Sequence, residues 1–287
     1  MKNLILSFLA ILFGLSLTAQ TPEQLTRVLK ETNRAKLQTM SNIYRQKAEE
    51  QKALAIEAAL ENGWPITIET DSSFSEIQSL DEFGNPVYYI THNSNAAKTV
   101  SSNKLYSGGG LGLNLSGSGM LVGEWDGAAV FTSHEDFNNT GSSRVTQKDA
   151  AVLDHWHATH VAGTIIGGGL YLSGGNSSIG MAYNASLYAY DWNTDVAEMT
   201  AEAANGLLLS NHSYGFTSGW SGSTWYGTPA ISVLEDYGFG FYSSEVAAYD
   251  NLAVSAPYYL IVKSAGNDRD DTGDGSYPDD GPYDCIG

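Results

Sequence analysis

The chain has 287 residues, and its 42% hydrophobic and 11% aromatic content is enough for a packed core, which excludes an intrinsically disordered protein. Its 14 Lys and Arg residues against 32 Asp and Glu residues give a formal net charge of −18. Such an acidic protein repels phosphate backbones, so we expect no nucleic acid among its partners.

The first 19 residues have the features of a secretory signal peptide. Lys2 precedes an apolar run over residues 4–17, and Ala19 is the small residue expected before a cleavage point. The run is too short to span a bilayer comfortably, so we expect no membrane span in the mature chain and a secreted, periplasmic or extracellular location. With Cys285 as the only cysteine, the exported protein would depend on its core rather than on disulfides.

Residues 20–105 are expected to form a small α+β unit. Residues 21–63 read as one long helix, because Thr21 suits the N-cap and an Asn-Gly pair suits the stop. Strand-like alternation follows over residues 66–70, and a second strand over residues 87–90 comes after a turn.

Residues 107–119 are rich in glycine and serine, and we interpret them as a linker because glycines that cradle a phosphate follow a strand and open a helix. Beyond the linker, strand and helix patterns alternate, with strands over residues 120–125, 186–192, 207–212 and 258–264 and helices from residue 157, over residues 198–205 and over residues 243–256. Such alternation predicts an α/β fold, a doubly wound parallel sheet with helices on both faces. We therefore expect a second, larger domain over residues 106–287.

Three polar residues are expected at one edge of this sheet. Asp126 ends the first strand, His157 opens the helix that follows, and Asn267 lies beyond the last strand. The carboxyl ends of parallel strands meet at one edge, where loops carry reactive groups. His157 belongs to the run D-H-W-H-A-T-H-V-A-G-T over residues 154–164, and such a histidine cluster fits either a general base paired with a nucleophile or a metal site.

These motifs resemble those of the subtilisin-like serine peptidases, from about residue 115 to the end of the chain. G-S-G-M-L-V-G-E-W-D is similar to the motif of the catalytic aspartate, H-A-T-H-V-A-G-T to that of the catalytic histidine, and S-A-G-N to the segment of the oxyanion-hole asparagine. The resemblance implies that Asp126 orients His157, which acts as the general base, and that Asn267 donates to the oxyanion. The run N-H-S-Y-G resembles the strand that pairs with an extended peptide substrate, here through Ser213, Tyr214 and Gly215.

The chain also departs from the family pattern. Gly127 follows Asp126 where the family has Ser or Thr, and Ala158 replaces the glycine after the catalytic histidine. The family's G-T-S-x-x-x-P motif does not occur in the 287 residues. We therefore expect an N-terminal fragment, truncated at the C-terminus, whose nucleophilic serine lies beyond the end of the chain and which is itself inactive.

The resemblance further implies a role for the first part of the chain. Residues 20–105 would be a pro-region that assists folding and blocks the active site of the catalytic domain until it is removed. The expected partners are this pro-region and peptide or protein substrates.

Two other classes of function fit parts of the sequence. His155, His157 and His160 have the H-x-H-x-x-H spacing of a zinc-dependent hydrolase, although Thr159 stands where that motif has an aspartate. Aromatic residues over 216–242, among them Trp220, Trp225, Tyr226 and Tyr237, would suit a non-catalytic module that binds glycans or proteins, or equally a wall beside a peptide cleft.

The last segment of the chain is strongly acidic. Residues 268–284 contain seven aspartates, six of them close together over residues 268–280, a composition that suits either a structural Ca²⁺ site or a solvated loop. We expect no other cofactor.

Overall fold

The computed structural model describes residues 21–69, 74–81, 83–91, 102–138, 141–173, 176–221, 224–232 and 235–267. The expected signal peptide over residues 1–19 and the acidic segment over residues 268–284 lie outside this description. In the described ranges, no helix combines the length and the apolar character needed to cross a membrane.

A five-stranded parallel sheet forms the centre of the larger part of the chain. Strand β4 (Leu121–Asp126) lies in the middle of it, and the strand order is β13-β9-β4-β8-β5. The other strands are β5 (Val145–Gln147), β8 (Ser186–Asp191), β9 (Leu209–His212) and β13 (Leu260–Lys263). All four pairings are parallel, which confirms the parallel sheet predicted from the alternating pattern. The sequence pattern missed β5, which has only three residues.

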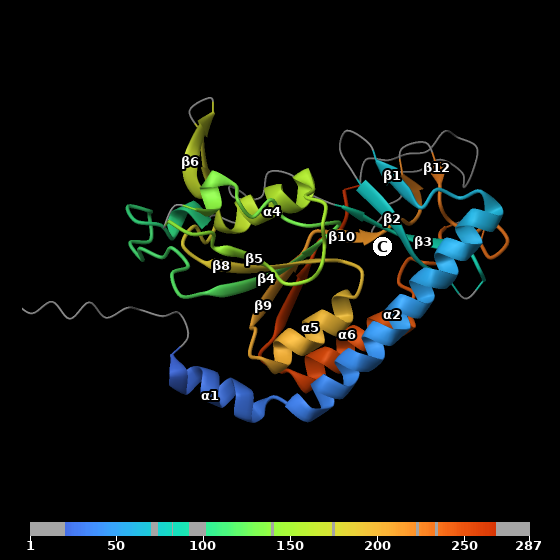
Figure 1. The fold of residues 1–287 in the computed structure, drawn as a ribbon, viewed down its shortest axis with the longest axis horizontal. Coiled ribbons are helices and arrows are strands. Elements are labelled where there is room, and N and C mark those ends of the chain that lie inside the picture. The colour runs from blue at the N-terminus through green and yellow to red at the C-terminus, as the bar shows by residue number, and fades with distance from the viewer. Residues whose placement is uncertain are drawn as a thin grey trace, which may run out of the picture.

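Helices cover both faces of this sheet (Figure 1). Because side chains alternate along a strand, Val122 packs on one face beneath α4 (Trp156–Ile166), and Trp125 packs on the other. The Trp125 face carries α5 (Asp195–Ala204) and α6 (Ser244–Ser255). The observed architecture is therefore the mixed α/β arrangement that the sequence predicts.

The N-terminal helix is broken, so the prediction of one continuous helix was wrong. The structure has α1 (Pro22–Glu31) and α2 (Arg34–Asn62). Thr32 is extended between them, and the Asn33 side chain accepts the backbone N–H of Lys36 and so caps a new helix. The predicted ends are confirmed, because Thr21 forms a capping box and Gly63 ends α2 in the left-handed conformation at φ 71°.

A second sheet joins the two parts of the chain. Strands β1 (Thr67–Glu69), β2 (Phe74–Leu80) and β3 (Pro86–Thr91) are antiparallel, and β3 pairs in turn with β10 (Tyr214–Phe216). Helix α2 packs along α5, and its Leu37 and Met40 side chains enter the same core as Trp125. The expected pro-region and the larger domain therefore share both a sheet and a hydrophobic core.

Short elements complete the described part of the chain. They are η1 (Ser102–Lys104), η2 (Glu135–Phe137), the hairpin of β6 (Gly168–Ser173) and β7 (Asn176–Ile179), and the hairpin of β11 (Trp220–Ser221) and β12 (Thr224–Trp225).

Candidate active site

Asp126 and His157 form a buried pair at the carboxyl end of β4. The Nδ1 atom of His157 lies 2.8 Å from Oδ1 and 2.9 Å from Oδ2 of Asp126, and each side chain is only 1% exposed. The Asp126 carboxylate also accepts the N–H of Gly127 at 2.7 Å. Since the carboxylate can only accept, the proton of the His157 ring sits on Nδ1. The Nε2 atom has no hydrogen-bond partner among the described residues, which leaves its lone pair able to take a proton, as a general base requires.

The loops on either side of this pair are tied together by backbone hydrogen bonds. Ala129 donates to Leu153 O at 3.1 Å, and the N–H of His155 donates to Ala129 O at 2.9 Å. The Nδ1 atom of His155 then accepts the N–H of His157 at 3.2 Å and so caps α4. This cap fixes the start of the helix, and with it the position of the His157 ring.

The zinc interpretation finds no ligand set in the described ranges. No three His, Cys, Asp or Glu side chains within them are placed to hold a metal ion. The Nδ1 atom of His155 caps the helix and that of His157 binds Asp126, so the two nitrogens are already engaged. His160 lies one turn further along α4 and is exposed.

A second carboxyl group lies beside the pair, and sequence reasoning missed it. Glu124 is two residues before Asp126 on β4, so both side chains point to the face covered by α4. Glu124 is fully buried, and neither of its carboxyl oxygens has a hydrogen-bond partner in the described part of the chain. Burial, and then the neighbouring charge of Asp126, raise the pKa of Glu124 well above its ordinary value. The alternation of side chains along a strand was the signal in the sequence that could have placed Glu124 beside Asp126.

The strand predicted to bind substrate is already paired. Tyr214 lies opposite Thr91, and Gly215 lies opposite Ile90, in the antiparallel pairing of β10 with β3. Ser213 lies in the corner before β10, where its hydroxyl accepts the Asn211 side-chain amide at 2.8 Å. The edge of β10 is therefore occupied by a strand from the N-terminal part of the same chain.

The side chain of Tyr214 takes part in a buried hydrogen-bond relay beneath β10. The Tyr259 hydroxyl donates to Ser210 Oγ at 2.6 Å, and Ser210 Oγ lies 2.8 Å from Nε2 of His212. Nδ1 of His212 lies 3.0 Å from the Tyr214 hydroxyl, which donates to Asp195 at 2.6 Å. Burial holds the pKa of His212 well below its ordinary value, so the ring is neutral, with one donor and one acceptor, as the relay requires. The Tyr214 hydroxyl thus ties β10 to Asp195 at the start of α5.

Trp125 holds the strand that carries Asp126 on the same buried side. Its ring stacks on Tyr190 with centroids 4.6 Å apart and on His212 with centroids 5.2 Å apart. Its indole N–H donates to the Glu198 carboxylate at 3.0 Å. These three contacts hold the Trp125 side chain in place, next to Asp126 on β4.

Asn267 lies at the same edge of the sheet as Asp126. Ser264 extends the pairing of β13 by donating to His212 O at 2.9 Å, and Asn267 follows three residues later with an exposed side chain. No hydrogen bond joins Asn267 to Asp126 or to His157 within the described ranges. Its predicted role in an oxyanion hole therefore stays a prediction.

The aromatic segment after β10 packs against the N-terminal part of the chain. Trp220 is 1% exposed and lies against Trp225 with ring centroids 5.4 Å apart. The Tyr237 hydroxyl donates to Asp81, in the turn between β2 and β3, at 2.5 Å. Trp220 is therefore too buried in this structure to stack on a sugar, and the prediction of a wall beside a peptide cleft stays a prediction.

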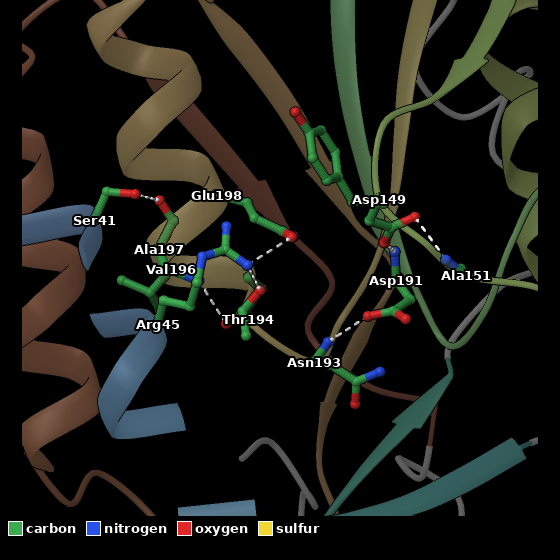
Figure 2. A network of polar contacts seen from close by, with 12 residues as sticks. Ser41, Arg45, Asp149, Ala151, Asp191, Asn193, Thr194, Val196, Ala197 and Glu198 are labelled. Atoms are coloured by element: carbon green, nitrogen blue, oxygen red, sulfur yellow. Dashed lines mark hydrogen bonds and ion pairs between the residues drawn. The ribbon is translucent and has the colours of Figure 1, made fainter. Parts of the chain in front are cut away.

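Helix α2 is attached to α5 by polar contacts as well as by packing (Figure 2). Arg45 donates to Thr194 Oγ1 at 3.0 Å, and its guanidinium lies 3.6 Å from the Glu198 carboxylate. The Ser41 hydroxyl donates to Ala197 O at 2.5 Å. Burial raises the pKa of Glu198 to about 7, although the hydrogen bond from Trp125 opposes the shift.

Comparison with known protein families finds a match to this chain. The model of the subtilase family matches residues 117–284, which is more than half of the chain and includes Asp126, His157 and Asn267. A search among curated proteins finds none that matches the chain.

Proposed function

Because the chain belongs to the subtilase family of serine peptidases, we propose that it is the precursor of a secreted endopeptidase that uses an Asp-His-Ser triad. The observation that carries this proposal is the buried Asp126–His157 pair, in which Nδ1 is bound to the carboxylate and Nε2 is not engaged by any described residue. This is the arrangement that a general base of the triad needs.

The chemistry follows from the two ring nitrogens of His157. Nε2 takes the proton of the serine hydroxyl as the serine attacks the peptide carbonyl, and later gives that proton to the leaving amine. Asp126 stabilises the imidazolium that forms between the two steps. Asn267 would donate its amide N–H to the oxyanion of the tetrahedral intermediate.

We further propose that the nucleophilic serine belongs to a later segment of the protein than these 287 residues. The G-T-S-x-x-x-P motif does not occur in the 287 residues, and no serine hydrogen bonds to the Nε2 atom of His157 in the described ranges. The proposal therefore needs a serine from a later segment, which would approach His157 at the edge of the sheet.

The pairing of β3 with β10 supports a blocked precursor. An extended substrate that adds to the edge of β10 needs the backbone groups that β3 now uses, so the two compete for one site. Removal of the pro-region would follow cleavage between Thr91 and Leu105, close to the boundary expected from the sequence.

The proposal is tested with a chain extended through the serine motif. Such a chain should hydrolyse an internal peptide bond and react with a serine-directed fluorophosphonate, and N-terminal sequencing should place a new terminus between residues 92 and 105. Hydrolysis that a zinc chelator abolishes, without fluorophosphonate labelling, would contradict the serine mechanism.

A further inference from the structure

The Tyr89 side chain of β3 fills a pocket built by the subtilase part of the chain. Its ring centroid lies 5.2 Å from that of Tyr214, 5.2 Å from that of Phe216 and 5.6 Å from that of Trp192. Its hydroxyl donates to the Glu245 carboxylate at 2.7 Å, and the whole residue is only 6% exposed. These four residues lie within the 117–284 match, whereas Tyr89 comes from the expected pro-region, as do Leu37 and Met40 of the same buried cluster.

Tyr89 occupies this pocket from the position that a substrate residue would take. It lies opposite Phe216 in the antiparallel pairing of β3 with β10, and the backbone of Thr217 continues the pairing by donating to Tyr88 O at 3.1 Å. A peptide that replaced β3 in the same register would place one of its residues opposite Phe216, where Tyr89 now lies. Because side chains alternate along a strand, the residue there would point into the same pocket.

The direction of β3 places this residue relative to the bond that is cut. From Tyr89 to Thr91 the strand runs from Phe216 toward Tyr214, and so toward the carboxyl end of β9. That end lies beside the end of β4, where Asp126 is found. The residue in the pocket is therefore on the amino side of the scissile bond.

We propose that this pocket, lined by Trp192, Tyr214, Phe216 and Glu245, is a substrate subsite that selects a tyrosine side chain on the amino side of the cleaved bond. The inference rests on the proposed peptidase function and adds the class of substrate. The three aromatic rings give a ring-shaped space, and Glu245 at its end accepts a phenol hydroxyl, which phenylalanine lacks. The ammonium of Lys263 lies 5.7 Å from the centroid of the Tyr89 ring, so it would repel a positively charged substrate side chain in the pocket.

The test uses the activated full-length enzyme and a set of internally quenched peptides. The peptides are identical except that Tyr, Phe, Lys or Ala stands at one of the positions before the cleaved bond. At one position, we expect kcat/KM for Tyr to exceed that for Phe roughly tenfold, the size of one buried hydrogen bond to a carboxylate, and Ala and Lys to be poorer still.

Variants then assign the preference to the pocket. Glu245→Leu should reduce the ratio of Tyr to Phe to about one, whereas Asp250→Leu, which changes an exposed carboxylate on the same helix, should keep the ratio. Cleavage with no preference for Tyr over Phe at any position would overturn this inference and leave the proposed function intact. If no peptide is cleaved at all, the proposed function fails and the inference fails with it.

Discussion

Glu198→Gln tests whether the contact between α2 and α5 holds a neutral carboxyl group or an ion pair. Glu198 is 6% exposed, accepts the Trp125 indole N–H at 3.0 Å, and lies 3.6 Å from the Arg45 guanidinium. Glutamine keeps the shape of the side chain and an oxygen that can accept from Trp125, but it cannot ionise. The comparison therefore isolates the charge.

The raised pKa of Glu198 sets the sign and the size of the effect. The folded protein holds the proton up to a pKa of about 7, whereas the unfolded chain loses it near the ordinary value of 4.5. Unfolding is therefore favoured by rising pH between these two values, and above pH 7 the folded state has lost on the order of 3 kcal/mol relative to acid conditions. The glutamine variant avoids this loss, and the attraction of the exposed Arg45 is already contained in the pKa of about 7.

Urea unfolding followed by tryptophan fluorescence measures the difference. We expect Glu198→Gln to be more stable than the unchanged chain at pH 8.5, by about 1–3 kcal/mol, and the gain to shrink at pH 5.5. Glu57→Gln, at an exposed site on α2, is the control for net charge. A glutamine variant that is less stable at pH 8.5 would show that Glu198 is ionised and paired with Arg45, and would refute the reasoning.

Three other substitutions test the packing of α2, the buried relay and the cap of α4. Leu37→Ala should lower the unfolding free energy by about 2–5 kcal/mol in urea titrations, because the side chain is fully buried in the shared core. Leu54, which is 59% exposed, is the control, and a similar loss for Leu54→Ala would contradict a shared core. Tyr214→Phe should lower the unfolding free energy by about 3 kcal/mol, because the two buried partners of its hydroxyl lose a hydrogen bond. Tyr242→Phe, at an exposed site, should change the unfolding free energy little, and equal effects of the two substitutions would speak against the relay. His155→Ala should lower the melting temperature through loss of the cap, worth about 0.5–2 kcal/mol, and a zinc chelator that lowers it equally in the unchanged chain would favour a metal site instead.

The sequence predicts those features whose signals are local. Hydrophobic periods of 2 and 3.6 residues, with caps and stops, place most strands and helices of the parallel sheet. Asp126 and His157 are predictable because each lies in a contiguous motif, and a strand end and the next helix start meet at one sheet edge. A single short strand such as β5 carries too few residues for its period to be recognised.

Features that depend on distant residues are not predictable in this way. The pairing of β3 with β10 joins residues 89–91 with residues 214–216, and nothing in either segment identifies the other. The motif around Tyr214 indicates backbone pairing with a substrate, but the hydrogen bond of its hydroxyl to Asp195, 19 residues earlier, cannot be predicted from the motif. The helix break at Thr32 was missed because Asn33 is compatible both with a helix interior and with an N-cap, and only the capped structure shows which prevails.

Peptide hydrolysis by His157→Ala is the most direct test of the account. In a chain that continues through the serine motif, we expect this substitution to lower kcat by a factor on the order of 10⁶, the size found when the catalytic histidine of subtilisin itself is removed. The 287-residue chain should hydrolyse no peptide and should not react with a fluorophosphonate. Undiminished hydrolysis by His157→Ala would contradict the account, as would labelling of a serine within the 287 residues that depends on His157.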